Sequence, residues 1–328
     1  MTGHETRARV PSSRLPVVAL AIAGVLALGS LLLPDGGPAT TSPGTTTGAP
    51  APAPTAHPCS GVRESLRPTG PLPAPGALPA GSTMAAIAAR GRLIAGVDQG
   101  KYLAGYRNPI TGQIEGSDIA IVHQIAAAIL GDPDAVQFVV LDIADRASAV
   151  RDGRVDMVVN SFTVTCARQQ LVEFSTAYTT VSQRMLVPVG SGVRDVEDLA
   201  GRRVCTSAGS TTEQVLRELP LGLEVSTRAG IPDCVLDLQH GRVDAVSSDD
   251  VILAGLAAQD PQTEIVGGAL DSSRYAIGMR LDQPDLVRFV NGVLERSRAD
   301  GSLAAGNQRW FAGHLDPVPP VAPAAYRD

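Results

Sequence analysis

Two segments of similar sequence each lead into a group of side chains that could bind a charged ligand. The segments read DGRVDMVVN at 152–160 and HGRVDAVSS at 240–248, and the apolar run in each predicts a strand. An arginine and two hydroxyl residues follow the first strand, and two aspartates follow the second: Ser161, Thr163, Arg168, Asp249 and Asp250. An arginine fork can hold a carboxylate with two hydrogen bonds, and a buried aspartate requires a partner. Because ligands of open α/β sheets bind beyond the carboxyl ends of strands, we expect a ligand site at these two places.

The elements around these segments alternate between strand and helix in two successive sets. In the first set, strands are predicted at 92–98, 136–141 and 155–159, with helices at 118–130 and 145–151. In the second set, strands are predicted at 203–206, 223–227 and 243–247, with helices at 210–219, 234–240 and 251–258. Alternation of this kind is typical of open α/β sheets, so we expect an α/β fold with one such sheet in each half.

Composition and charge exclude several classes of protein. The chain has 328 residues with 27 basic and 33 acidic side chains, a net charge of −6, and no basic stripe for nucleic acid phosphates. Its hydrophobic fraction of 44 % is that of a globular chain able to bury a core. The cysteines form no CxxC motif or cluster with histidine, so we expect neither a metal nor a cofactor.

The N-terminal quarter of the chain differs from the body. An uncharged apolar run at 15–33 follows three arginines and is long enough to cross a bilayer; this charge pattern predicts a cytoplasmic segment at 1–14 and a body outside the membrane. We favour an uncleaved anchor over a cleaved signal peptide, because the run is long and no good cleavage site follows it. Residues 34–83 have the composition of an extended linker, and a proline-rich tail is expected at 315–328.

Four cysteines allow three disulfide pairings: Cys59, Cys166, Cys205 and Cys234. An exported body would lie in a compartment where disulfides persist. We favour Cys205–Cys234, because both residues fall in the second half of the strand and helix pattern. That choice leaves Cys59 to pair with Cys166 and to fasten the end of the linker to the body.

Several motifs of the body resemble a known family. The stretch DRASAVRDGRVDMVVNSFTVTCARQQLVEFSTAY at 145–178 is similar to the core signature of the type 3 extracellular solute-binding proteins, which serve ABC importers of polar amino acids. Further matching stretches follow the order and spacing of that family: RGRLIAGVDQ (90–99), GSDIAIVHQIA (116–126), DLAGRRVCTSAGSTTE (198–213), GRVDAVSSDDVILAGL (241–256), RYAIGM (274–279) and FVNGVLERSRADG (289–301). The resemblance covers about 90–312. The cysteines and the proline-rich tail resemble the membrane-tethered glutamine/glutamate-binding branch of Gram-positive bacteria.

The resemblance implies a two-lobed, type II periplasmic-binding-protein-like fold. Lobe 1 would comprise 84–178 and 276–314, and lobe 2 would comprise 182–271. The two crossing segments would form a hinge whose limits are Tyr178, Ser182, Asp271 and Tyr275. Ligand binding would then close the two lobes of a monomer by a hinge motion.

The same resemblance implies roles for individual residues. Arg168 stands where the family grips the α-carboxylate of an amino acid, Thr163 where a threonine supports both α-groups, and Ser161 where glycine or serine is common. Asp249 stands where an acid binds the α-ammonium, with its neighbour Asp250 as the alternative. In addition, the family alignment brings Thr211 and Thr212 to the ligand. Ser117 departs from the family, which has phenylalanine there, and we expect little functional effect.

The side-chain selectivity of such a site would rest on Asp98 and Lys101. Asp98 ends the first strand, at a position that often reads the ligand side chain, and an aspartate there suits an amide or a cation. Lys101 is the only lysine of the chain, and it could pair with an acidic ligand group or with Asp98 itself. Arg184 could act similarly. The alternative for Lys101 is a position on the solvated surface.

These observations favour a receptor without catalytic activity. Its expected ligands are glutamate, aspartate, glutamine and asparagine, and its expected partner is an ABC permease or, alternatively, a membrane sensor protein. An enzyme on the same scaffold would require a general acid or base in the cleft. The candidates for such a group are Glu173, Glu213, His123 and His240, and we expect all of them to be structural or exposed.

Overall fold

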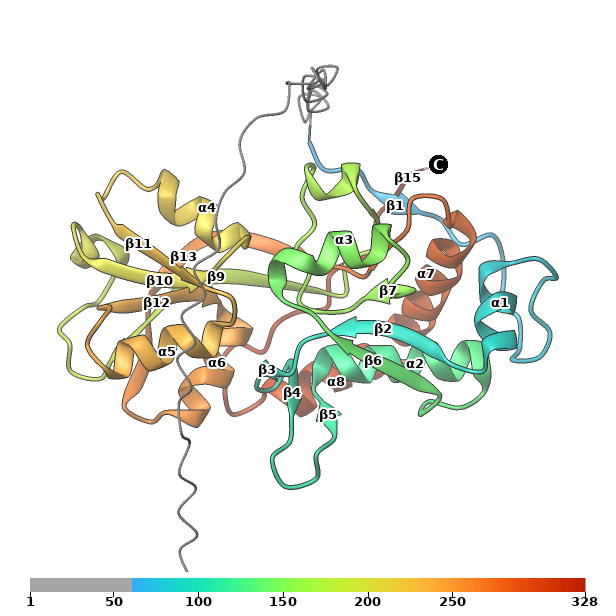
Figure 1. The fold of residues 1–328 in the computed structure, drawn as a ribbon, viewed down its shortest axis with the longest axis horizontal. Helices are drawn as coiled ribbons and strands as arrows, with labels where there is room; N and C mark the ends of the chain where they lie inside the picture. The colour runs from blue at the N-terminus through green and yellow to red at the C-terminus, as the bar shows by residue number, and fades with distance from the viewer. Residues whose placement is uncertain (1–60, 328) are drawn as a thin grey trace, which may run out of the picture. The chain divides into compact units, whose positions relative to one another are not determined.

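Two five-stranded sheets form the framework of residues 61–327, which the computed structural model describes (Figure 1). In the first sheet, the strand order is β6-β2-β7-β14-β8. Its strands are β2 (Leu93–Val97), β6 (Val136–Val140), β7 (Met157–Val158), β8 (Glu173–Phe174) and β14 (Gly278–Met279). The strand β2 is parallel to β6 and β7, whereas β14 is antiparallel to β7 and β8. Strands that lie far apart in the sequence, such as β2 and β14, therefore belong to one sheet.

Helices cover both faces of this first sheet. Successive side chains of a strand point to opposite sides, and here both sides carry apolar residues that the helices bury. Leu93, Ala95 and Val97 pack in the core beneath α2, α7 and α8, whereas Val158 packs in the core beneath α3 (Figure 1). The helices of this half are α1 (Thr83–Arg90), α2 (Ser117–Leu130), α3 (Arg146–Arg151), α7 (Pro284–Ala299) and α8 (Ser302–Phe311). A small antiparallel sheet joins β2 to α2: β3 (Gly100–Lys101), β4 (Gly105–Arg107) and β5 (Ile114–Glu115).

The second sheet has the order β11-β10-β12-β9-β13. Its strands are β9 (Thr179–Pro188), β10 (Arg203–Ser207), β11 (Glu224–Arg228), β12 (Ala245–Asp249) and β13 (Thr263–Tyr275). The helices are α4 (Thr211–Glu218) on one face and α5 (Ile231–Gln239) and α6 (Asp250–Gln259) on the other (Figure 1). The predicted disulfide Cys205–Cys234 is confirmed and joins β10 to α5. Cys59 lies outside the described residues, so its pairing with Cys166 stays a prediction.

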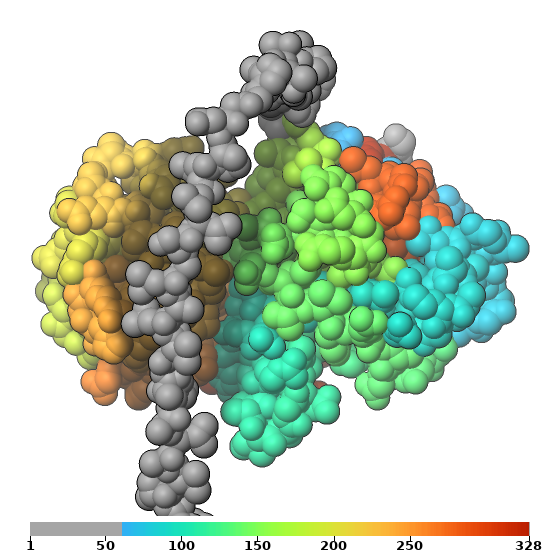
Figure 2. Space-filling view, viewed as in Figure 1, coloured from blue at the N-terminus to red at the C-terminus, as the bar shows by residue number. Residues whose placement is uncertain are grey.

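The chain crosses between the two sheets twice, and the fold is the two-lobed α/β architecture that the resemblance implies. The first crossing runs from β8 into β9 and the second from β13 into β14. The crossing strands pair in antiparallel register, with Ser182 opposite Ser272 and Thr179 opposite Tyr275. In the space-filling view, the yellow and orange surface of lobe 2 adjoins the green and teal surface of lobe 1 (Figure 2).

Both ends of the described chain pack on the body, which differs from the expected linker and tail. The strand β1 (Ser65–Leu66) pairs in parallel with β15 (Tyr326–Arg327). Apolar side chains from both segments cover the core of lobe 1: Leu66, Leu72, Leu78, Leu315, Val318 and Val321. The part of the expected linker between residues 61 and 83 is therefore packed on lobe 1 and is not a free spacer. The C-terminal tail is packed on lobe 1 in the same way.

No helix among the described residues is long and apolar enough to cross a membrane. The predicted cytoplasmic segment at 1–14, the predicted anchor at 15–33 and the linker up to residue 60 lie outside the described residues. These expectations stay predictions.

Candidate functional site

A narrow cavity of about 30 Å³ lies between the two lobes, at the carboxyl ends of their strands. Lobe 1 contributes five lining residues: Lys101, Ile143, Arg146, Ser161 and Thr163. The others come from lobe 2 and the second crossing: Ser207, Ser210, Thr211, Thr212, Ile231, Ser248, Asp249, Ile252 and Tyr275. The site therefore lies after β7 and β12, the two strands of the repeated sequence segment, as the sequence predicts.

Ser161 is held at the end of β7 by a buried aspartate. Its backbone lies in the left-handed region, with φ 46°, which is uncommon for a residue other than glycine. Asp118, at the start of α2, accepts hydrogen bonds from the Ser161 amide at 2.7 Å, the Ser161 hydroxyl at 3.0 Å and the Tyr178 hydroxyl at 2.8 Å. Burial nevertheless raises the pKa of Asp118. The sequence reasoning missed Asp118, which connects the Ser161 turn with Tyr178, a residue predicted to lie at the hinge.

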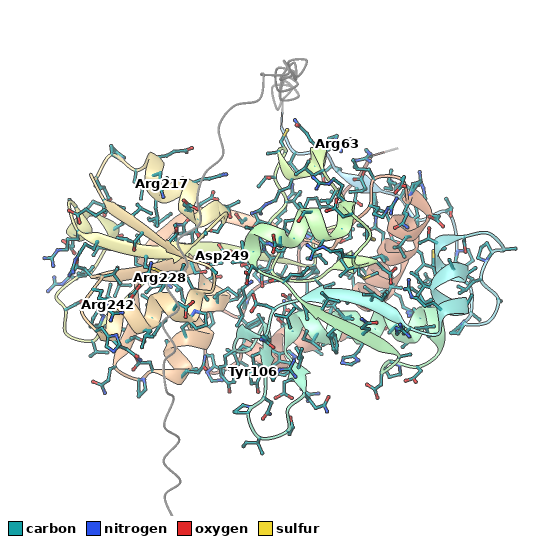
Figure 3. The ribbon with its side chains drawn as sticks, in the orientation of Figure 1. Arg63, Tyr106, Arg217, Arg228, Arg242 and Asp249 are labelled. Atoms are coloured by element: carbon teal, nitrogen blue, oxygen red, sulfur yellow. A yellow bond between two sulfur atoms is a disulfide. The ribbon has the colours of Figure 1, made fainter. Side chains whose placement is uncertain are left out.

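Asp249 ends β12 and is buried in the cavity wall (Figure 3). It accepts a hydrogen bond from the hydroxyl of Tyr275, a residue expected only at the hinge. Burial raises the pKa of Asp249 to about 6, although the Tyr275 hydrogen bond opposes the shift. Its neighbour Asp250 accepts the amide of Val251 at 2.8 Å at the start of α6. Asp249 is therefore the aspartate that faces the cavity.

Arg168 is not among the residues that line the cavity. It lies in a short 3-10 turn, η2 (Arg168–Gln170), and contacts the lining residue Thr163. Its guanidinium donates to the carbonyl of Thr163 at 2.8 Å and, across the lobes, to the carbonyl of Gly209 at 3.2 Å. Burial lowers its pKa to about 10, against the attraction of Asp249. No carboxylate of the described residues forms an ion pair with Arg168, so its guanidinium is a partly buried cation bonded to carbonyl oxygens.

Arg146 is a second buried arginine, and the sequence reasoning missed it. It begins α3 and is 3 % exposed. It donates from Nε to the Ile143 carbonyl at 2.9 Å and from Nη1 to the carbonyls of Asn160 and Ser161, both at 3.0 Å. Within residues 61–327, Nη2 has no hydrogen-bond acceptor and no carboxylate pairs with the group. Burial and the nearby Arg168 lower its pKa to about 9.

Arg146 and Arg168 both lie against the ring of Phe162. The guanidinium carbons are 4.6 Å and 5.1 Å from the ring centroid. A guanidinium over an aromatic ring is attracted by the ring quadrupole, but a ring does not neutralise the charge. The two cations therefore give this side of the cavity a positive character.

Lys101 is buried rather than solvated, which excludes the surface alternative. It is 5 % exposed, and its Nζ lies 2.6 Å from Asn160 Oδ1 and 3.0 Å from Asp98 Oδ2. Lys101 thus pairs with Asp98 itself, and Asp98 is not among the residues that line the cavity. Arg184 donates to the carbonyl of Gly267 and also lies away from the cavity lining.

The start of α4 brings hydroxyl groups to the cavity from lobe 2. The Ser210 side chain caps the helix by accepting the Glu213 amide at 3.0 Å. The Thr212 hydroxyl bonds to Ser210 at 2.7 Å and is therefore engaged within lobe 2. The Thr211 hydroxyl lies 3.5 Å from that of Thr163 and reaches across to lobe 1. Both predicted threonines line the cavity, but only Thr211 bridges the lobes.

The cavity also has an apolar wall that the sequence did not reveal. Ile143, Ile231 and Ile252 line it together with the charged groups. Each isoleucine lies near the start of a helix or 3-10 turn, in η1 (Ile143–Asp145), α5 and α6. Apolar contact of this kind suits the methylene groups of a ligand side chain.

The candidate acids for an enzyme lie elsewhere. Glu173 is bonded to Arg327 at 2.6 Å, and Glu213 is bonded to Arg217 at 2.8 Å. No glutamate or histidine of the described residues lines the cavity. The described residues also contain no cluster of acidic, cysteine or histidine side chains that could hold a metal ion.

Comparisons with known proteins agree with this arrangement. Residues 93–313 match the family described as bacterial extracellular solute-binding proteins, family 3. The chain is 32 % identical over 230 residues to the ABC transporter glutamine-binding protein GlnH of Bacillus subtilis (strain 168), covering 70 % of this chain and 84 % of the relative. It is 27 % identical over 256 residues to the glutamate/aspartate import solute-binding protein of Salmonella typhimurium, covering 75 % and 83 %.

The similarity extends to solved structures. A crystal structure of the solute receptors for L-cysteine of Neisseria gonorrhoeae superimposes with a TM-score of 0.69 at 26 % identity, covering 74 % of this chain and all of that chain. The named ligands of these similar proteins differ, although each is an amino acid.

Proposed function

Because the chain belongs to family 3 of the bacterial extracellular solute-binding proteins, we propose that it captures a polar amino acid between its two lobes for import by an ABC transporter. The candidates are glutamate, aspartate, glutamine and asparagine, and the cavity favours the two acidic ones. The relatives named for glutamine and for glutamate/aspartate support this ligand class. A permease is the partner that this role implies, at the extracytoplasmic face of the membrane. Residues 15–33 would anchor a monomer there.

The α-groups of the amino acid would be held from opposite lobes. Its ammonium would pair with Asp249, whose other neighbour is the Tyr275 hydroxyl. Its α-carboxylate would bind Arg168 with help from Thr163 and Thr211, and Ser161 would border it. An amino acid that joins Asp249 to Arg168 would stabilise the closed arrangement, because it contacts both lobes.

The observation that carries the preference for an acidic ligand concerns two arginines, the buried Arg146 and the partly buried Arg168. Neither has a carboxylate partner among the described residues. Arg146 and Arg168 are bonded only to carbonyl oxygens, and a buried cation without a counterion is unfavourable. A single α-carboxylate would neutralise one of them. A second carboxylate on the ligand side chain would reach Arg146, while Lys101 is already neutralised by Asp98.

The test is calorimetric titration of the full-length chain with L-glutamate, L-aspartate, L-glutamine and L-asparagine. We expect micromolar affinity for the acidic pair, about −8 kcal/mol, and weaker binding of the amides. Arg168→Ala should weaken all four ligands, whereas Arg146→Met should remove the preference for acids. The matched control is Arg151→Met, because Arg151 is an exposed arginine of the same helix, α3. Absence of binding by all four ligands would refute the proposal, and an Arg146→Met variant that keeps the preference would refute its acidic form.

A sensory role is the second candidate. In that role the closed form would signal to another membrane protein rather than deliver its ligand. The observation that favours it is the packing of the N-terminal segment beside the Arg168 turn. Uptake of labelled glutamate by cells with and without the gene separates the two roles, because only delivery requires uptake to fall.

A further inference from the structure

The N-terminal segment reaches the turn that carries Arg168. Arg63 lies at the start of the described chain, two residues before β1 (Figure 3). From there it contacts Gln169, which follows Arg168 in η2 and is separated from Arg63 by 106 residues. The chain segment that follows the predicted anchor and linker is thus in direct contact with the turn that carries Arg168.

Three hydrogen bonds join Arg63 and Gln169. The Arg63 amide donates to Gln169 Oε1 at 2.7 Å, and Gln169 Nε2 donates to the Arg63 carbonyl at 2.7 Å. The third runs from Arg63 Nη2 to the Gln169 carbonyl at 2.8 Å. Gln169 is only 3 % exposed, and both the oxygen and the nitrogen of its side-chain amide bond to one residue of a distant segment. We refer to this arrangement as the Arg63–Gln169 clamp.

The clamp adds side-chain contacts to the backbone hydrogen bonds of the turn. In those bonds the Gln169 amide donates to the Thr165 carbonyl at 3.0 Å, and the Leu171 and Val172 amides donate to the Arg168 carbonyl at 2.9 Å and 3.0 Å. The turn η2 spans three residues, and Gln169 is the one that is buried; Ala167 and Gln170 are exposed. The amide of Arg168 donates to the Thr165 hydroxyl at 3.2 Å, a long contact. Because Gln169 is the one buried residue of the turn η2, loss of its partners would allow the turn to open locally.

We propose that Gln169 and Arg63 are positioning residues for Arg168, so that the N-terminal segment is a functional part of the ligand site. This inference rests on the proposed function, in which Arg168 binds the α-carboxylate. A turn that is correctly placed for only part of the time lowers the apparent affinity in proportion to that fraction. The clamp acts before the ligand arrives, by keeping the Arg168 side chain within reach of both Thr163 and Gly209.

The first test uses Gln169→Met, which keeps the length of the side chain and removes two of the three hydrogen bonds. Arg63→Ala is the milder second variant, because it removes only the bond from Nη2. The matched control is Tyr326→Phe, which removes a hydrogen bond to Glu295 from the adjoining strand β15 and does not touch the turn. Calorimetry gives the affinity of the full-length chain for L-glutamate and L-glutamine, and hydrogen exchange reports the opening of residues 163–170.

We expect Gln169→Met to weaken both ligands by the same factor, about tenfold for two lost hydrogen bonds. The factors match because the α-carboxylate is common to the two ligands. In Gln169→Met without ligand, we expect the hydrogen-exchange rate of residues 163–170 to rise. In Tyr326→Phe, we expect the affinity and the exchange rate to stay at the wild-type level.

Wild-type affinity in Gln169→Met would overturn the inference, as would a loss confined to one of the two ligands. A fall in melting temperature with unchanged affinity would show a purely structural contact and also overturn it. These outcomes differ from failure of the proposed function, in which the wild-type chain itself binds no amino acid.

Discussion

Gly255 provides a direct test of lobe closure. It lies in α6 of lobe 2, facing the backbone of Tyr102 in lobe 1, just after β3. A Cβ atom added at Gly255 would lie 2.2 Å from the Tyr102 carbonyl oxygen and 3.0 Å from its carbonyl carbon. Both atoms belong to the backbone, so no side chain can rotate away. The overlap can be relieved only if α6 moves away from lobe 1.

We predict that Gly255→Ala stabilises the fold but weakens ligand binding. Within lobe 2, replacing glycine by alanine in a helix interior favours folding by about 1 kcal/mol. Between the lobes, the overlap of roughly 1 Å with a carbonyl oxygen opposes closure. If it reduces the closed population by about 100-fold, the apparent Kd rises by the same factor, or about 2.7 kcal/mol. We therefore expect a chain that is as stable as the wild type or more so, and that binds poorly.

The assay compares Gly255→Ala with Gly306→Ala. Gly306 lies within the helix α8, and a Cβ atom added there would meet nothing within 4 Å. Gly306→Ala should raise the melting temperature and leave the affinity for glutamate unchanged. Small-angle scattering should show ligand-induced compaction in the wild type and in Gly306→Ala but not in Gly255→Ala. Wild-type affinity in Gly255→Ala would refute the reasoning, because binding would then not require this approach of the lobes.

Two further predictions concern pH and the disulfide. Burial raises the pKa of Asp249 to about 6, and in the proposed function the carboxylate of Asp249 pairs with the ligand ammonium. The affinity should therefore fall about tenfold from pH 7 to pH 5, and a flat calorimetric profile would contradict this. The same shift lowers stability without ligand as the pH rises from about 4 through 6, since the folded chain binds this proton more tightly than the unfolded chain. Asp249→Asn should therefore remove that contribution from pH-dependent melting curves. The Cys205–Cys234 bond closes a loop with a sequence separation of 29, so replacing both cysteines by alanine should lower the free energy of unfolding by about 3 kcal/mol, and a denaturant titration that shows no change would contradict this.

The sequence predicted the parallel strands of both sheets because these strands follow a local pattern, but it did not predict β8, β9, β13 or β14. Apolar runs such as 92–98 become β2, and the residues after the two similar segments do line one cavity. Strand alternation predicts that only one of Asp249 and Asp250 points inward, and the structure shows that it is Asp249. These features depend on neighbours in the chain, so a single sequence contains them.

Other parts of the site depend on contacts that are distant in sequence. Arg146 reads as a surface residue of a short helix, and its burial arises only where α3 meets Phe162 and the end of β7. The proline-rich ends look like free spacers by composition. Their scattered leucines, such as Leu66 and Leu72, were the available signal that they pack on lobe 1.

The position of Lys101 makes the chain suited to single-site chemical labelling. It is the only lysine of the sequence, and it lines the cavity while 5 % exposed. An amine-selective reagent therefore has one side-chain target, and that target is shielded when the lobes meet around it. The rate at which the reagent modifies Lys101 would measure directly how often the cavity wall is open to solvent, without any engineered probe.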